Sequence, residues 1–345
     1  MMRSNRIRHF AWAVLLAAAI SGCAAPSVKP DGTGTDRLQR VWPPPPADAR
    51  VVYVRSVAAP GDLGMRPSFF RRVANFLTGG RDGTEPLVKP FGIALDEDGN
   101  LCVTDTGVGA VSFFDLGGNR YRRFEEIGKL RFVAPVAVVK RNGIFYVADS
   151  GLASVLAFDT QGNLRIRIQA ELERPSGLAI AGEKLYVADA QAHAVAVFDM
   201  AGKFLARFGR RGVEPGEFNF PTHLSSDAKG RLYVTDSMNS RVQVFDADGR
   251  FLNVIGGMGD GSGHFSRPKG VAVDGFGNVY VADALYDNLQ IFDEKGRFLL
   301  DVGRAGSEEG EFWMPAGVAI GRNNEIYVAD SYNCRVQQFQ YVGKP

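Results

Sequence analysis

The sequence predicts an all-β protein, a six-bladed β-propeller of four-stranded antiparallel blades with an N-terminal strand closing the last blade. Three observations lead to this prediction. A Tyr-Val-Ala-Asp motif, or a close variant, occurs six times at intervals of 40 to 47 residues. Each complete unit holds four short β-rich runs separated by Gly, Asn and Asp turns. The sixth unit ends after its third run, and an unpaired strand-like segment precedes the first unit.

The chain starts like an export signal. Three arginines precede an apolar run from Phe10 to Ile20, which is too short to span a membrane comfortably. The run ends in Ile-Ser-Gly-Cys, which resembles the bacterial lipobox, where the leader is cleaved before a cysteine that takes the lipid. We therefore predict a lipoprotein signal peptide over residues 1–22 and lipidation of Cys23, for example by palmitate. An ordinary signal peptide that contains a cysteine is the alternative.

The predicted location follows from the same segment. The chain would be exported and lipid-anchored in the bacterial envelope. No Asp stands beside Cys23, so by resemblance to sorted lipoproteins the outer membrane is favoured, in a host that has one.

Charge bears on the class of partner. The 40 basic and 38 acidic residues give a net charge of +2, but three of the arginines lie in the leader. The mature chain would carry 37 basic residues and a net charge of −1. Such a balance gives no electrostatic basis for binding nucleic acid, and we expect no nucleic-acid partner.

Two segments come between the lipid site and the first blade. Residues 23–48 are rich in Pro, Gly, Thr and Ala and should form an extended tether. Residues 49–87 should hold the closing strand, at residues 50–57, and a short amphipathic helix at residues 67–80 with Ser68 as its N-cap. We expect this helix to dock on the propeller, and binding to a membrane surface is the alternative.

Residues 88–345 form the propeller. Its repeated groups read Pro-x-Gly-Val-Ala-Val-Asp, Gly-Asn-x-Tyr-Val-Ala-Asp, Arg-Val-Gln-x-Phe-Asp and Gly-Arg-Phe-Leu, and they resemble the NHL repeat family, best in units 4 to 6. The aspartates at the strand ends should accept backbone N–H bonds, and Arg241 and Arg335 should each pair with the aspartate five residues earlier. We interpret these residues as structural because they recur in blade after blade.

Function should instead lie where the repeats differ, on the face where first strands begin and second-to-third turns emerge. The repeats differ at the first and second residues after the blade-opening proline, where Lys269 breaks the pattern at the first position and His223 at the second. The candidate ligand-binding residues on this face are Thr222, His223, Met238, Asn239, Lys269, Tyr286, Tyr332 and Asn333.

The main functional hypothesis is a membrane-anchored binding or scaffold module whose propeller face takes a protein, peptide or glycan. The alternative is a metal-dependent enzyme of the lyase or lactonase kind, with a divalent ion in the central channel. Peptide-amidating lyases resemble NHL propellers and hold zinc with histidines from separate blades. This mature chain has only His193, His223 and His264, so we predict no catalytic residue, metal ligand or cofactor.

Two cysteines remain after Cys23. Cys102 stands at a tyrosine position in the middle of a strand, and Cys334 stands in a turn of the last unit. A disulfide requires Cα atoms within about 7 Å. We predict that these two residues remain separate thiols, although ring closure makes their blades neighbours.

Overall fold

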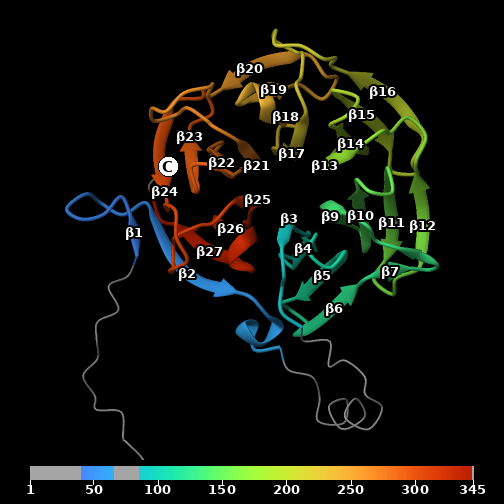
Figure 1. Cartoon of the computed structure of the whole chain (residues 1–345), viewed down its shortest axis with the longest axis horizontal. Helices are drawn as coiled ribbons and strands as arrows, with labels where there is room; N and C mark the ends of the chain where they lie inside the picture. Colours follow the sequence, from blue (N-terminus) through green and yellow to red (C-terminus); the bar gives the residue numbers. More distant parts are fainter. Residues whose placement is uncertain (1–39, 66–84, 344–345) are drawn as a thin grey trace, which may run out of the picture. The chain divides into compact units, whose positions relative to one another are not determined.

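The computed structural model describes residues 40–65 and 85–343, which belong to one compact unit. The strands of this unit form six antiparallel blades around a central axis (Figure 1), so the predicted six-bladed propeller is confirmed. The signal peptide, Cys23 and the expected helix at 67–80 lie outside the described residues. Among the residues described, no helix is long and apolar enough to cross a membrane.

Each blade runs outward from the axis in chain order, and all neighbouring strands are antiparallel. The strands of the first three blades are β3 (Pro90–Leu95), β4 (Leu101–Asp105), β5 (Ala110–Asp115), β6 (Arg120–Phe124); β9 (Pro135–Arg141), β10 (Ile144–Asp149), β11 (Ser154–Asp159), β12 (Leu164–Ile168); and β13 (Pro175–Ala181), β14 (Lys184–Asp189), β15 (Ala194–Asp199), β16 (Phe204–Phe208). A small hairpin, β7 (Glu126–Ile127) with β8 (Leu130–Arg131), connects blades 1 and 2.

The other blades repeat this plan. Their strands are β17 (Pro221–Ser226), β18 (Leu232–Asp236), β19 (Arg241–Phe245), β20 (Phe251–Ile255); β21 (Pro268–Val273), β22 (Val279–Asp283), β23 (Asn288–Phe292), β24 (Phe298–Val302); and β25 (Pro315–Ile320), β26 (Glu325–Asp330), β27 (Arg335–Tyr341). Single 3-10 turns η2 (Ser237–Asn239) and η3 (Ser331–Asn333) follow β18 and β26, and η1 (Pro60–Leu63) follows the closing strand described next.

Blade 6 takes its outer strand from the start of the propeller. Strand β2 (Val51–Val57) pairs antiparallel with β27, so that Val51 lies opposite Tyr341 and Val57 opposite Val336. This confirms the closing strand expected at residues 50–57. Its pairing covers an edge of β27 that would otherwise be open.

One difference concerns the expected tether. Its last part contains β1 (Val41–Trp42), which pairs with β2 and gives blade 6 a fifth strand. The ring of Trp42 packs edge-on against Phe339, with 5.7 Å between ring centroids. The proline-rich composition predicted an extended chain here, but the tryptophan gains a buried apolar partner by joining the sheet.

The core is divided among the junctions between blades. Both faces of a blade are covered by its neighbours, so the second strands are buried along almost their full length. Six apolar clusters result, one at each junction. This burial explains why the Tyr-Val-Ala-Asp run is apolar on both alternating faces.

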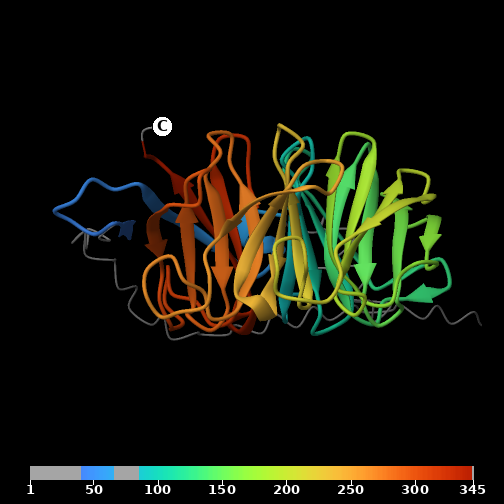
Figure 2. The same cartoon turned by 90° about the horizontal axis from the view of Figure 1, so that it is seen from above.

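The ring has two distinct faces. We call the side where the inner strands begin the start face, and the side where they end the end face. Figure 2 shows the ring from the side, with the end face uppermost. Because strand direction alternates within a blade, the second-to-third turns and the connections between blades also lie on the start face. The first-to-second and third-to-fourth turns lie on the end face.

Candidate functional site

The repeated aspartates at the ends of the second strands fasten the loops of the start face. All six are fully buried. In blade 1, Asp105 accepts backbone N–H bonds from Val88 and Lys89 at 2.7 and 2.9 Å, in the loop just before its own inner strand. The corresponding aspartate accepts the same pair of bonds in blades 2, 3 and 5, and one of the two in blades 4 and 6. The structural role expected from the sequence is therefore confirmed.

Two of these aspartates also hold an arginine. Arg241 pairs with Asp236 at 2.9 Å and Arg335 pairs with Asp330 at 2.8 Å, as the spacing predicted. Each guanidinium also donates to backbone carbonyls of the preceding loop. The loops of the start face are thus fixed in blades 4 and 6 by networks of charged hydrogen bonds.

Large exposed apolar side chains gather on the start face. Trp313 is 54% exposed, Leu285 52%, Met238 49% and Tyr332 46%. All four lie in second-to-third turns or in connections between blades. Among the described turns of the end face, large exposed apolar side chains are limited to Phe276 and Val342. An apolar surplus on one face is typical of an interaction surface.

An aromatic group lies at the junction of blades 6 and 1. The rings of Trp313 and Tyr332 have centroids 5.5 Å apart, and Lys89 Nζ lies 4.5 Å from the Tyr332 centroid. Lys89 also donates to the Tyr332 hydroxyl at 3.2 Å. The sequence prediction included Tyr332 but missed Trp313 and Lys89. The sequence could have indicated both residues, because the two positions before each blade-opening proline vary among the repeats as much as the position after it.

The axis of the start face is occupied by side chains from opposite blades. The ring of Phe91 in blade 1 lies 5.5 Å from the ring of His223 in blade 4, and Lys269 Nζ in blade 5 lies 5.8 Å from the Phe91 centroid. Each inner strand shifts register just after its opening proline. Such irregularities re-aim side chains, which brings these three residues of separate blades together.

His223 stands where four of the other blades have glycine. At those glycines the inner strands touch backbone to backbone: a Cβ on Gly177 would lie 2.9 Å from the Cα of His223, and one on Gly270 only 2.4 Å from the Ala316 carbonyl oxygen. His223 places a ring at this crowded level and is buried. Burial, and then the charge of Lys269, lowers the pKa of His223 to about 3, so the imidazole is neutral at pH 7.

Polar atoms around the axis lack partners. Both ring nitrogens of His223 and the Oγ1 of Thr222 are buried without a hydrogen-bond partner among the described residues. Leaving a buried polar group unsatisfied costs about 1–3 kcal/mol. Lys269 is half-buried, and burial followed by the charges of Arg267 and Arg174 lowers its pKa to about 8.

Beyond these residues a central channel of about 530 Å³ runs between the six inner strands. Most of the residues that line it are apolar, among them Ile93, Val138 and their counterparts in other blades. Toward the end face it gains Asp96, Glu97 and Lys140. Phe91, His223 and Lys269 lie on the start-face side of this channel.

The other sequence-predicted residues lie farther out, in the turns. Asn239 donates to Asp236 and to the Gly212 carbonyl, Asn333 donates to Asp330 and to the Gly306 carbonyl, and the Tyr286 hydroxyl donates to the Gly259 carbonyl. These three side chains hold loops in place, whereas Met238 and Tyr332 are exposed. The eight predicted residues therefore divide into an axial set (Thr222, His223, Lys269), a loop-holding set and an exposed set.

The three histidines of the propeller do not converge. The Nδ1 of His193 accepts the Phe220 backbone N–H at 3.2 Å, and His264 is exposed in the loop between blades 4 and 5. Over residues 40–65 and 85–343, no three His, Cys, Asp or Glu side chains group closely enough to hold a metal ion.

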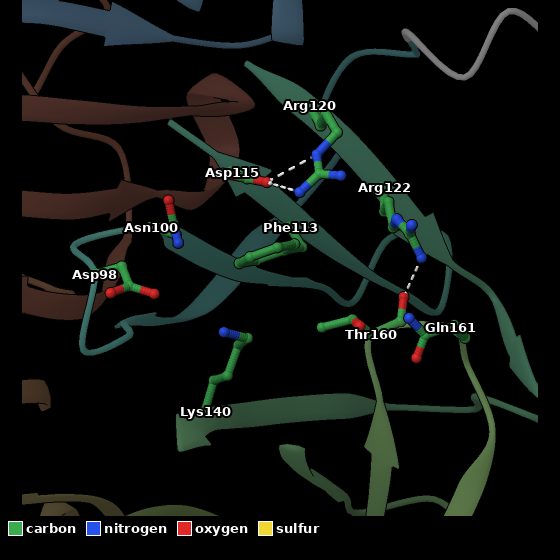
Figure 3. Close-up of a pocket in the computed structure, with 9 residues that line it drawn as sticks. All are labelled: Asp98, Asn100, Phe113, Asp115, Arg120, Arg122, Lys140, Thr160 and Gln161. Carbon is green, nitrogen blue, oxygen red and sulfur yellow. Dashed lines mark hydrogen bonds and ion pairs between the residues drawn. The ribbon is translucent and has the colours of Figure 1, made fainter. Parts of the chain in front are cut away.

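A second cavity, of about 340 Å³, opens at the junction of blades 1 and 2 (Figure 3). Phe113 lies among polar residues there, and Lys140 and Arg122 approach from opposite sides (Figure 3). Lys140 pairs with Asp96 at 2.6 Å and lies 5.0 Å from the Phe113 centroid. Asp115 and Arg120, which also line this cavity, pair with each other at 2.9 Å.

The cavity lies beside a departure in the repeat. Five blades have a tyrosine in the second strand, but blade 1 has Cys102. In blade 3 the corresponding hydroxyl, on Tyr186, donates to the Ala247 carbonyl of the next blade at 2.9 Å. The equivalent carbonyl here belongs to Thr160, and Arg122 donates to it instead. Cys102 is buried and Cys334 is exposed, and both are free thiols, as predicted.

Comparisons with known families match parts of the propeller. Residues 312–339 match the NHL repeat, and residues 168–231 and 223–284 match a family described as a 6-bladed beta-propeller. The NHL match falls in the sixth blade, one of the three units in which the sequence resemblance was strongest. These matches agree with the observed number of blades.

Solved structures share the fold at low sequence identity. Virginiamycin B lyase from Staphylococcus aureus is 11% identical with a TM-score of 0.55, covering 74% of this chain and 96% of that one. A protein of unknown function from Bacteroides thetaiotaomicron is 17% identical with a TM-score of 0.55, covering 74% and 70%. A chain of a nidogen/laminin complex is 18% identical with a TM-score of 0.51, covering 63% and 83%. Identities this low support the fold alone.

Proposed function

We propose that this chain is a binding module whose propeller holds a protein or peptide partner on its start face. The observation that supports this best is the one-sided distribution of exposed apolar side chains. Trp313, Tyr332, Met238 and Leu285 lie on the start face, on loops fastened by buried aspartates. Rigid aromatic anchors on fixed loops lose little conformational entropy on binding.

A polypeptide suits this face better than a glycan. Its apolar groups are spread over several blades, and they include aliphatic side chains and methionine besides the aromatic group at Trp313. Such dispersed apolar contacts are typical of protein–protein interfaces. The lyase alternative has support from the shared fold alone.

The proposal includes the envelope location expected from the sequence. A lipid on Cys23 would hold the module at a bacterial membrane, with the outer membrane favoured. Replacing Cys23 by Ser should leave the protein unprocessed or released from the membrane fraction. Unchanged membrane attachment of that variant would contradict the anchor without affecting the binding proposal.

The binding proposal is tested by photo-crosslinking in intact cells. A photoreactive phenylalanine analogue replaces Trp313 in one variant and Phe276 in a control variant. Phe276 is 49% exposed but lies on the end face. We expect a discrete adduct of defined mass from position 313 and none from position 276. Equal adducts from both positions, or none from position 313, would overturn the proposal.

A further inference from the structure

Lys269 carries a positive charge for which the described residues provide no counter-ion. Lys269 is the second residue of β21, where it lies beside the axis and is half-buried. Its aromatic contact is with Phe91, and no carboxylate among the described residues forms an ion pair with it. A partly desolvated ammonium without a partner costs folding free energy, and an anionic ligand would offset that cost.

The surroundings of Lys269 add positive charge. Arg174 and Arg267, each next to a blade-opening proline, are the two charges that act on Lys269 after burial. Both arginines are exposed on the start face. The nearby turn aspartates Asp189 and Asp283 direct their carboxylates at backbone N–H groups and form no ion pair with either arginine side chain among the described residues.

Polar groups able to form hydrogen bonds also lie near the axis of the start face. His223, which is only 8% exposed, has two ring nitrogens without partners, and Thr222 has an unpartnered buried hydroxyl oxygen. A neutral imidazole offers one N–H donor, and the threonine hydroxyl offers a second. The Phe91 ring excludes water from one side, which strengthens electrostatic attraction at the site.

We propose that the axis of the start face, at Lys269, His223 and Thr222, binds a carboxylate group of the partner, with Arg174 and Arg267 attracting it. Arg174 and Arg267 are exposed, so a ligand at the axis meets one partly desolvated positive charge, that of Lys269, and a single negative charge matches it better than a doubly charged phosphate. The inference rests on the proposed function, because the carboxylate belongs to the polypeptide held by the surrounding apolar groups. A peptide C-terminus or an acidic side chain supplies this chemistry.

The test uses small probes and the propeller without its signal peptide. N-acetylglycine is titrated at pH 7 while the side-chain NMR signals of His223 and Phe91 are followed, with N-acetylglycinamide and inorganic phosphate as comparison probes. We expect saturable shifts with N-acetylglycine and none with the uncharged amide. Lys269→Met should weaken the affinity by about 30-fold or more, because it removes the charge at the site.

Matched variants keep the test specific. Lys203 is an exposed lysine of an end-face turn, and Lys203→Met should leave the N-acetylglycine affinity unchanged. Lys269→Arg retains the charge and should retain part of the affinity, which separates loss of charge from loss of fold. Absence of binding to the native protein, equal binding by Lys269→Met, or binding of phosphate without N-acetylglycine would overturn the carboxylate site.

The two experiments distinguish failure of the carboxylate site from failure of the binding module. A crosslink at position 313 together with no N-acetylglycine binding would overturn the carboxylate site and leave the binding module supported. N-acetylglycine binding that depends on Lys269, together with no crosslink at position 313, would support the site and overturn the polypeptide-binding proposal.

Discussion

The exchange of tyrosine for cysteine in blade 1 is compensated by the residue opposite it. Cys102 pairs across strands with Phe113. The corresponding pair in blade 3 is Tyr186 with Val197, and in blade 4 it is Tyr233 with Val244. Blade 1 therefore places its large ring on the third strand rather than the second. The aromatic volume is conserved, but the hydroxyl that would reach the next blade is lost, and a cavity opens there.

This compensation predicts strong coupling between the two positions. Cys102→Tyr alone should lower the free energy of unfolding by about 1–3 kcal/mol, because the Phe113 ring already fills the space. Adding Phe113→Val should restore most of this loss, since it recreates the pairing of blades 3 and 4. Urea unfolding of the native protein, both single variants and the double variant measures the coupling. If the effects of the two substitutions on the free energy of unfolding simply add, Phe113 does not compensate for the missing tyrosine.

The buried imidazole of His223 predicts a dependence of stability on pH. Its pKa is lowered from 6.5 to about 3 by burial. As the pH falls below 6.5, the unfolded chain takes up a proton that the folded protein does not accept until about pH 3. Stability contributed by this group is therefore lost as the pH falls through this window, by up to about 1.4 kcal/mol per pH unit.

The measurement compares unfolding free energies at pH 7 and pH 4 for the native protein and His223→Gln. Carboxylates titrate in both proteins, so only the difference between them reports on His223. The native protein should lose up to about 3 kcal/mol more than the variant over this range. Parallel losses in the two proteins would show that the imidazole is not held neutral.

At the scale of elements, we expect substitutions at two residues of the closing strand β2 to differ sharply in their effect on stability. Val51 is fully buried against blade 6, whereas Val54 in the same strand is 47% exposed. Val51→Asp should lower the free energy of unfolding by about 3 kcal/mol or more, because it buries an unpaired charge. Val54→Asp should change it by no more than about 0.5 kcal/mol. Similar effects of the two substitutions on urea unfolding would argue against β2 as an integral strand of blade 6.

Elements differed in how well the sequence predicted them. The blades could be predicted because each repeats the same strands and turns, and β2 could be predicted because blade 6 lacks a strand. Strand β1 could not, since a two-residue strand in a proline-rich segment has no period and depends on the contact of Trp42 with Phe339. Phe91 could not be predicted as a site residue from the sequence. Its contact with His223 joins opposite blades, and aligning the repeats does not show which side chains meet at the axis.

For the whole molecule, the ring could be predicted from the sequence more completely than the candidate site. The chain is nearly neutral, with a net charge of +2, and its composition gives no reason to expect a concentration of charge. The structure nevertheless brings Arg174, Arg267 and Lys269 from two blades to one face, near the axis. Local charge depends on how residues of separate repeats are arranged around the ring, which net charge cannot report.

The pairing of β2 with β27 also determines the order in which the molecule can be completed. Arg55 and Gln338, which bond to each other across this pairing, are 283 positions apart in the chain. Strand β2 therefore waits for β27, the last strand to be made, and its edge toward β27 stays open while every intervening blade is synthesised. Contacts this distant in sequence slow folding. If the chain is exported from its N-terminus, ring closure becomes a timing step: the propeller stays an open arc, and its start face is completed only when the final residues arrive.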